Sequence, residues 1–185
     1  MIGIYFVPIT NGSKENYNRY IKFFRKEIIN ILNNEKNVSL KKEFNEISQN
    51  NYKGMGLWSF SNNQGSNNRS YWEQMKVNDL VLFFNREEKL VSLGRVHRKF
   101  EENLSVEEAE SLFNYDEAVL AFILKDIAIF KESHVLHYDI GKLFNYDIKF
   151  PRGVLKVSEH RYDEEIINKV YELILLNTVE ESRGN

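Results

Sequence analysis

The sequence predicts an α+β fold, a small twisted β-barrel of about six strands flanked by helices. The order of elements in residues 56–99 is the first indication: an apolar strand, a polar loop, a short aromatic helix and two β-prone runs. An amphipathic helix over residues 163–176 is the second. The third is a composition of 42% hydrophobic and 14% aromatic residues in 185, enough for one core. We expect a single domain over residues 1–178 and a frayed tail over 179–185.

The N-terminal segment is predicted to contain one strand and two helices. Residues 2–9 are β-prone, and Pro8 favours an edge position or a bulge because proline cannot donate to a sheet ladder. Residues 15–32 carry apolar side chains at helical spacing. Ser39 can cap a second, shorter helix, and residues 48–53 are a polar linker.

The middle of the chain reads as a strand that ends in Trp58-Ser59, followed by an Asn-rich loop over residues 61–68 and a short helix over 71–75. Trp72, on that helix, is predicted to pack in the core. Two antiparallel strands follow, over residues 80–84 and 90–96, joined by a charged hairpin tip.

The C-terminal half begins with a capping box at residues 105–108, which predicts a helix reaching Leu112. Residues 118–124 and 127–130 are strands, either continuous or broken at 125–126. Residues 133–144 are ambiguous and are assigned a helical turn. A last strand over 154–157 precedes the helix of residues 163–176.

Composition narrows the class of protein. The chain has no cysteine, which excludes disulfides, thiolate zinc sites and cysteine nucleophiles. No apolar run approaches transmembrane length, and we expect a soluble cytoplasmic protein with no membrane partner. A net charge of −2 argues against strong sequence-independent binding of nucleic acid, although basic residues gather in 95–99 and 149–161 and permit a local basic face.

Catalytic patterns are not found in the sequence. There is no phosphate-binding loop of the GxxxxGK[ST] type, and we expect no cofactor and no catalytic residue. Asp79 and Glu87 superficially match the carboxylates of a Mg²⁺-dependent nuclease, but Asp79 begins a strand and Glu87 follows its far end, ~20 Å away. His134 and His137 lack an obvious third ligand, so no metal site is predicted.

The stretch from residue 58 to 96 resembles a known family through a series of spaced residues: Trp58-Ser59, Trp72, Met75-Lys76, Asp79, Val81–Phe84 and Leu93–Val96. It is similar to the EVE and YTH branch of the PUA-like superfamily, small domains that hold a flipped-out, usually modified base in an aromatic pocket. Within that branch it looks most similar to the N-terminal recognition domains of McrBC-type restriction systems. The resemblance implies a PUA-like fold in which residues 15–49 form a two-helix insertion.

The resemblance also implies a base-binding pocket around Trp58 and the Ser59 backbone. The alternative for Trp58 is a tryptophan of the core. Phe113 is favoured as the second aromatic wall and Tyr115 is kept as its alternate, at a place where tryptophan is usual in YTH domains. Polar groups for reading the base edge are expected from Thr10, Asn11 and Asn62, and the alternative for each is a turn residue.

Contacts to phosphate are expected from Arg69, Arg95, Arg98, Lys99, Lys149 and Arg152. The resulting hypothesis is a reader of modified double-stranded DNA, with N6-methyladenine favoured, in a modification-dependent restriction system. A nucleotide-driven motor and a nuclease would then be partners on other domains or subunits. The alternatives are a reader of N6-methyladenosine in RNA and, less favoured, a small nuclease that uses Asp79 and Glu87.

Overall fold

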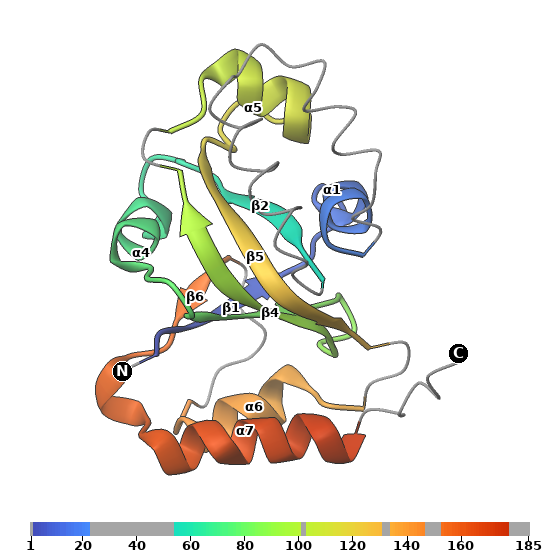
Figure 1. Cartoon of the computed structure of the whole chain (residues 1–185), viewed down its shortest axis with the longest axis vertical. Coiled ribbons are helices and arrows are strands. Elements are labelled where there is room, and N and C mark those ends of the chain that lie inside the picture. The colour runs from blue at the N-terminus through green and yellow to red at the C-terminus, as the bar shows by residue number, and fades with distance from the viewer. Residues whose placement is uncertain (1, 23–53, 101–102, 131–133, 147–152, 178–185) are drawn as a thin grey trace.

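The computed structural model describes residues 2–22, 54–100, 103–130, 134–146 and 153–177 (Figure 1). These form one curled sheet in the spatial order β2-β5-β4-β3-β1-β6. Its strands are β1 (Ile4–Pro8), β2 (Gly56–Phe60), β3 (Leu80–Phe84), β4 (Leu90–Lys99), β5 (Leu120–Ile129) and β6 (Leu155–Lys156). β1 and β3 run parallel, whereas the other neighbouring strands are antiparallel. The six strands of the α+β prediction are confirmed, but within the described residues β2 and β6 do not pair, so the sheet is a half-barrel.

The described helices cover both faces of this sheet. They are α1 (Lys14–Tyr17), the π-helical turn η1 (Asn18–Lys22), α4 (Asn68–Gln74), α5 (Val106–Phe113), α6 (His137–Leu143), the 3₁₀ turn η2 (Glu159–Arg161) and α7 (Glu164–Asn177). Of these, α1, η1 and α4 add side chains to the inner-face core, whereas α5, α6 and α7 pack on the outer face. The predicted capping box of α5 is present: Glu108 N–H donates to Ser105 Oγ (3.1 Å), and Ser105 N–H donates to the Glu108 carboxylate (2.9 Å). A reciprocal pair of this kind satisfies main-chain donors that a helix start leaves open.

The apolar run of β3 is explained by burial on both faces. Val81 and Phe83 join the core of the inner face, which gathers residues from five strands. Leu80, Leu82 and Phe84 pack on the outer face under α6 and α7. Another cluster forms where α5 covers β2 and β5, and Figure 1 shows α5 and the α6–α7 pair at opposite ends of the molecule. A strand buried on both faces reads as a continuous rather than an alternating apolar sequence.

The structure corrects one strand prediction and decides another that was left open. β1 is an internal strand between β3 and β6, not an edge strand. Pro8 is tolerated because β6 pairs with Tyr5 and Phe6 and does not extend to Pro8. The segments 118–124 and 127–130 form one strand, β5, in which the pairing register shifts around Asp126 (φ +52°). A bulge of this kind shifts the pairing register without ending the strand.

The predicted helix over residues 15–32 begins as α1 and η1, and its part beyond residue 22 lies outside the described residues. The second helix, the greater part of the insertion over 15–49 and the tail 179–185 also lie outside them. Within the described residues, no helix combines the length and the apolar character needed to cross a membrane.

Candidate functional site

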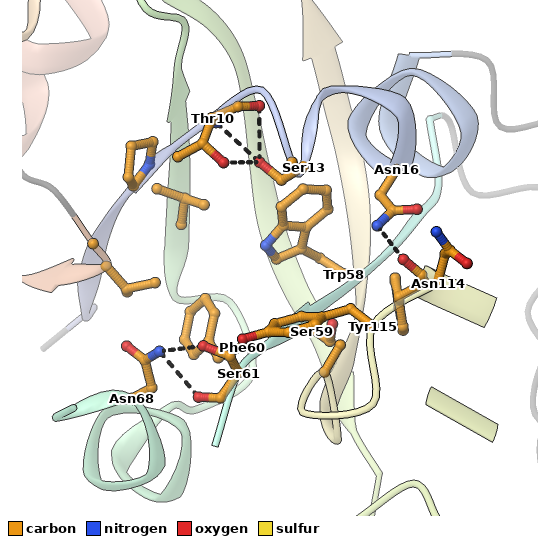
Figure 2. Close-up of a pocket in the computed structure, with 17 residues that line it drawn as sticks. Thr10, Ser13, Asn16, Trp58, Ser59, Phe60, Ser61, Asn68, Asn114 and Tyr115 are labelled. Carbon is orange, nitrogen blue, oxygen red and sulfur yellow. Dashed lines mark hydrogen bonds between the residues drawn. The ribbon is translucent and has the colours of Figure 1, made fainter. Parts of the chain in front are cut away.

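A cavity of about 600 Å³ lies at the open side of the half-barrel. Edge strand β2 borders it on one side, and the end of β1 and the residues just before β6 border it on the other. Figure 2 shows the side chains that surround it. The lining includes Val7, Pro8, Thr10, Ser13, Asn16, Trp58, Ser59, Phe60, Ser61, Asn68, Phe113, Asn114, Tyr115, Ala118 and Val154. Its size is typical of small-ligand sites, and its wall mixes aromatic rings with a few polar groups, as such sites do.

Trp58 forms one wall of this cavity. The side chain is 6% exposed, and its ring meets Phe83 edge-on, with centroids 5.2 Å apart. Among the described residues, Trp58 Nε1 has no hydrogen-bond acceptor, and Figure 2 shows it on the side facing other lining residues. By contrast, Trp72 is a core residue as predicted, and its Nε1 donates to the Ala121 carbonyl (3.1 Å). Trp58 therefore belongs to the core and also presents a donor to the cavity.

Tyr115 provides the exposed aromatic ring. Asn114 adopts a left-handed conformation (φ 52°) that ends α5 and turns the chain toward the cavity. The Tyr115 side chain is 42% exposed, and its hydroxyl donates to the Glu117 carboxylate, a bond that raises the pKa of Tyr115. Phe113 also borders the cavity, but it is buried and its ring packs against Tyr20 at 5.3 Å. Of the two predicted walls, Tyr115 has the free face.

The main chain of Ser59 points to the open edge of β2. The Ala121 carbonyl accepts from Phe100 N–H (3.4 Å) on the β4 side of β5. Successive residues of a strand direct their main-chain groups to opposite sides, so Phe122 faces β2 and bonds to its partner Trp58. Ser59, the next residue, directs its N–H and C=O away from β5 and toward the cavity that it lines. It offers a donor and an acceptor side by side.

Two asparagine side chains add polar groups that the sequence analysis missed. Asn16, on α1, donates through Nδ2 to the Phe113 carbonyl (2.6 Å). Asn68, on α4, donates through Nδ2 to the carbonyl (3.0 Å) and hydroxyl (3.1 Å) of Ser61. These bonds fix both amides at the cavity wall, and among the described residues neither Oδ1 has a donor. Nothing in the local sequence marks Asn16, because its place depends on contact with α5.

The other predicted base-reading residues fall in two groups. Thr10 lines the cavity, and its N–H donates to Ser13 Oγ (3.0 Å) at the start of α1. Asn11 and Asn62 do not line it. Asn62 lies at the rim, where its N–H donates to the Glu117 carbonyl (2.9 Å) and so joins the loop after β2 to the loop after α5.

Two of the predicted phosphate-binding residues contact other parts of the fold. Arg95 donates to the hydroxyl of Tyr171 and lies over its ring, so it packs against α7. Lys99 Nζ donates to the carbonyls of Trp72 (2.9 Å) and Glu73 (2.8 Å), at the C-terminal end of α4. Desolvation lowers the pKa of Lys99. Neither residue lines the cavity.

Among the described residues, Arg69 is the predicted cation that lies beside the cavity. It follows Asn68 on α4, its Nε donates to Asn62 Oδ1 (3.2 Å), and it pairs with Glu73 at 3.5 Å while half-exposed. Arg98 is half-buried on β4 and does not line the cavity. Lys149 and Arg152 lie outside the described residues.

The carboxylates of the nuclease alternative do not converge. Asp79 is 3% exposed, and its two oxygens accept from Gly3 N–H (2.6 Å) and Lys76 N–H (2.7 Å). Glu87 lies in the hairpin tip beyond the other end of β3 and pairs with Lys89 at 2.9 Å. Within the described ranges, no group of three or more His, Asp or Glu side chains is placed to hold a metal ion.

No protein-family model and no curated protein matches the chain. Among solved structures, it is similar to the "N-terminal domain of Thermococcus gammatolerans McrB bound to m5C DNA". The two share 15% sequence identity with a TM-score of 0.58, and the match covers 94% of this chain and 99% of that one. This likeness confirms the predicted PUA-like fold class, now with the sheet as a half-barrel.

Proposed function

We propose that this domain binds double-stranded DNA containing a modified base and holds that base, flipped out of the duplex, in the cavity beside Trp58. The cavity itself is the observation that carries the proposal: it is open to one side, walled by Trp58 and Tyr115, and lined by fixed polar groups. Flipping costs a few kcal/mol, and stacking on an aromatic ring contributes roughly 1–3 kcal/mol per base. An aromatic pocket with edge-reading groups offsets that cost.

The polar groups of the wall suit the edge of a base. The Ser59 C=O can accept from an exocyclic amine while its N–H donates to the neighbouring ring nitrogen. Adenine presents this pair as N6 and N1, and cytosine presents it as N4 and N3. Trp58 Nε1 and the amide oxygens of Asn16 and Asn68 supply further contacts from other directions.

Two modified bases are the leading ligands. N6-methyladenine is the one we favour, because the resemblance of residues 58–96 to YTH-like domains implies a pocket suited to a methylated exocyclic amine. 5-Methylcytosine stands beside it because the similar solved structure is bound to m5C DNA. The contacts proposed for Ser59 serve both bases, so a direct comparison of the two is required.

We place the domain in a modification-dependent restriction system of the McrBC type. Its motor and nuclease activities would belong to other domains or subunits, which makes this chain the recognition module. The support for this context is the resemblance of the sequence and the similarity to an McrB N-terminal domain. A reader of modified RNA is the alternative with the same pocket chemistry.

Binding to matched oligonucleotides tests the proposal. Fluorescence anisotropy would compare duplexes of one sequence that carry N6-methyladenine, 5-methylcytosine or no modification, together with the corresponding RNAs. We expect tenfold or greater preference for one modified DNA, and a 2-aminopurine beside the target should brighten as its neighbour leaves the stack. Equal affinity for modified and unmodified duplexes would overturn the proposal, and preference for modified RNA would support the alternative. A parallel incubation with Mg²⁺ would detect cleavage.

A further inference from the structure

We infer that the loop between β2 and α4, residues 61–67, reads the base pairs beside the target through the carboxamides of Gln64 and Asn67. This inference rests on the proposed function and deepens it, because it assigns preference for the flanking sequence to a second group of residues. The pocket would identify the modified base, and this loop would identify its neighbours.

The β2–α4 loop is held in a defined shape. Ser66 N–H donates to the Asn63 carbonyl (3.2 Å), which closes a turn with Gln64 and Gly65 at its tip. Gly65 has φ +81°, the conformation that glycine favours in such a turn. Asn63 Nδ2 donates to Tyr115 Oη (3.2 Å), which ties the loop to the cavity wall. A loop held in this way presents its tip at little cost in conformational entropy on binding.

Gln64 and Asn67 are the carboxamides of this loop left for a partner. Both residues are exposed, and among the described residues neither side chain makes a hydrogen bond. By contrast, Asn62 and Asn63 are used to hold the loop against Arg69 and Tyr115. Carboxamides can donate and accept at once, and in the major groove they pair with adenine N6 and N7.

The loop borders the cavity, so a duplex that places a base there would pass close to it. Ser61 and Asn68, at its two ends, both line the cavity. Gln64 is three residues from Ser61, so its main chain lies within ~10 Å of the wall. Base pairs rise about 3.4 Å per step, so this reach covers the first few pairs beside the target.

The charges around the cavity also favour a duplex that passes over the β2–α4 loop. Residues 61–67 contain no charged side chain, and Arg69 follows on α4. The loop after α5, which the Asn62–Glu117 main-chain bond joins to the base of this one, carries Asp116 and Glu117, both exposed. Carboxylates repel the phosphate backbone, so we expect the phosphates to pass over the uncharged tip of the β2–α4 loop and Arg69 and not over residues 116–117.

A selection from a duplex library tests the inference with the full chain. The library would hold the preferred modified base fixed and randomise three base pairs on each side, with an unmodified library in parallel. We expect the wild type to prefer particular flanking pairs by about five- to a hundredfold. A double variant, Gln64→Ala with Asn67→Ala, should lose that preference and keep the wild-type ratio of modified to unmodified binding. Both side chains are exposed, so folding should be unaffected, as circular dichroism would show.

Asn168→Ala is the matched control, because Asn168 is an exposed carboxamide on α7, at the other end of the molecule (Figure 1). This variant should keep both the flanking preference and the modification ratio. Flanking preference that survives in the double variant, or disappears in the control, would overturn the inference and leave the proposed function intact. A wild type that does not distinguish modified from unmodified duplexes would overturn both.

Discussion

At the residue scale, Trp58 has two roles, so its substitution is a poor test of the pocket. It packs edge-on against Phe83 in the core and also lines the cavity. Replacing it with alanine would remove core packing worth about 3–5 kcal/mol, so a loss of binding would not separate stacking from unfolding. Tyr115 lines the same cavity and is 42% exposed, which makes it the better probe.

Tyr115→Ala should weaken binding of the modified duplex about five- to a hundredfold, because an exposed ring that stacks on a base contributes roughly 1–3 kcal/mol. Tyr115→Phe keeps the ring and removes the hydroxyl bonded to Glu117 and Asn63, so it should bind within a few-fold of wild type. Anisotropy titrations would measure both, with thermal melts to verify folding. Wild-type affinity in Tyr115→Ala would assign the second wall to another residue.

At the element scale, α6 is fixed to the β3–β4 hairpin through a buried histidine. His137 N–H donates to the Glu88 carbonyl (2.6 Å), and the His137 ring packs edge-on against Phe6 and Phe84 at 5.2 and 5.0 Å. The side chain is 1% exposed, and desolvation lowers the pKa of His137 to about 4. The folded protein therefore holds this ring neutral at pH values where an exposed histidine is charged.

The free energy of unfolding should consequently fall as pH is lowered from 6.5 to about 4, since the unfolded chain takes up a proton that the folded chain resists. Above pH 6.5 the ring is neutral in both states, so His137 causes no change in the free energy of unfolding there. The total loss that it causes on lowering the pH is at most about 3 kcal/mol. Urea titrations across this range would measure it. His137→Phe retains an aromatic ring and should show a shallower dependence on pH. A slope equal to that of the wild type would show that other groups cause the loss.

At the scale of the whole molecule, the half-barrel leaves an opening in the sheet, and the cavity occupies it. With a net charge of −2, the surface provides little general attraction for phosphate. Arg95 and Lys99 are bonded within the fold, which leaves Arg69 as the predicted cation beside the cavity in the described part of the chain. Under the proposed function, we therefore expect specific contacts in the pocket to supply much of the affinity.

A salt titration should accordingly give a shallow slope of log affinity against log salt, about −0.9 for each phosphate neutralised. Arg69→Ala should reduce the magnitude of that slope by about one contact and weaken modified and unmodified duplexes equally. Lys169→Ala removes an exposed charge from α7 and serves as the control. An unchanged slope in Arg69→Ala would remove this residue from the phosphate contacts, and a loss confined to the modified duplex would make it a base-reading residue.

The sequence by itself determined the features that depend on neighbouring residues. The apolar run of β3, the capping box at Ser105 and the polar loop after Trp58 all lie where they were predicted. Periodicity and capping report local burial and local hydrogen bonds, which is why they can be read along the chain. The choice of Trp58 and Ser59 as candidates also came from the sequence, through the resemblance to YTH-like domains.

Only the tertiary structure decided which of the candidates share one cavity. Asn16 and Asn68 are 52 positions apart in the sequence, and both reach the cavity because α1 packs near α5 and α4 follows the edge strand. Phe113 is buried and Tyr115 is exposed because the left-handed turn at Asn114 separates them. The sequence predicts Arg95 to be a surface cation, but in the fold α7 places Tyr171 against it. Such contacts join distant segments, and no local pattern records them because each depends on how the whole sheet curls.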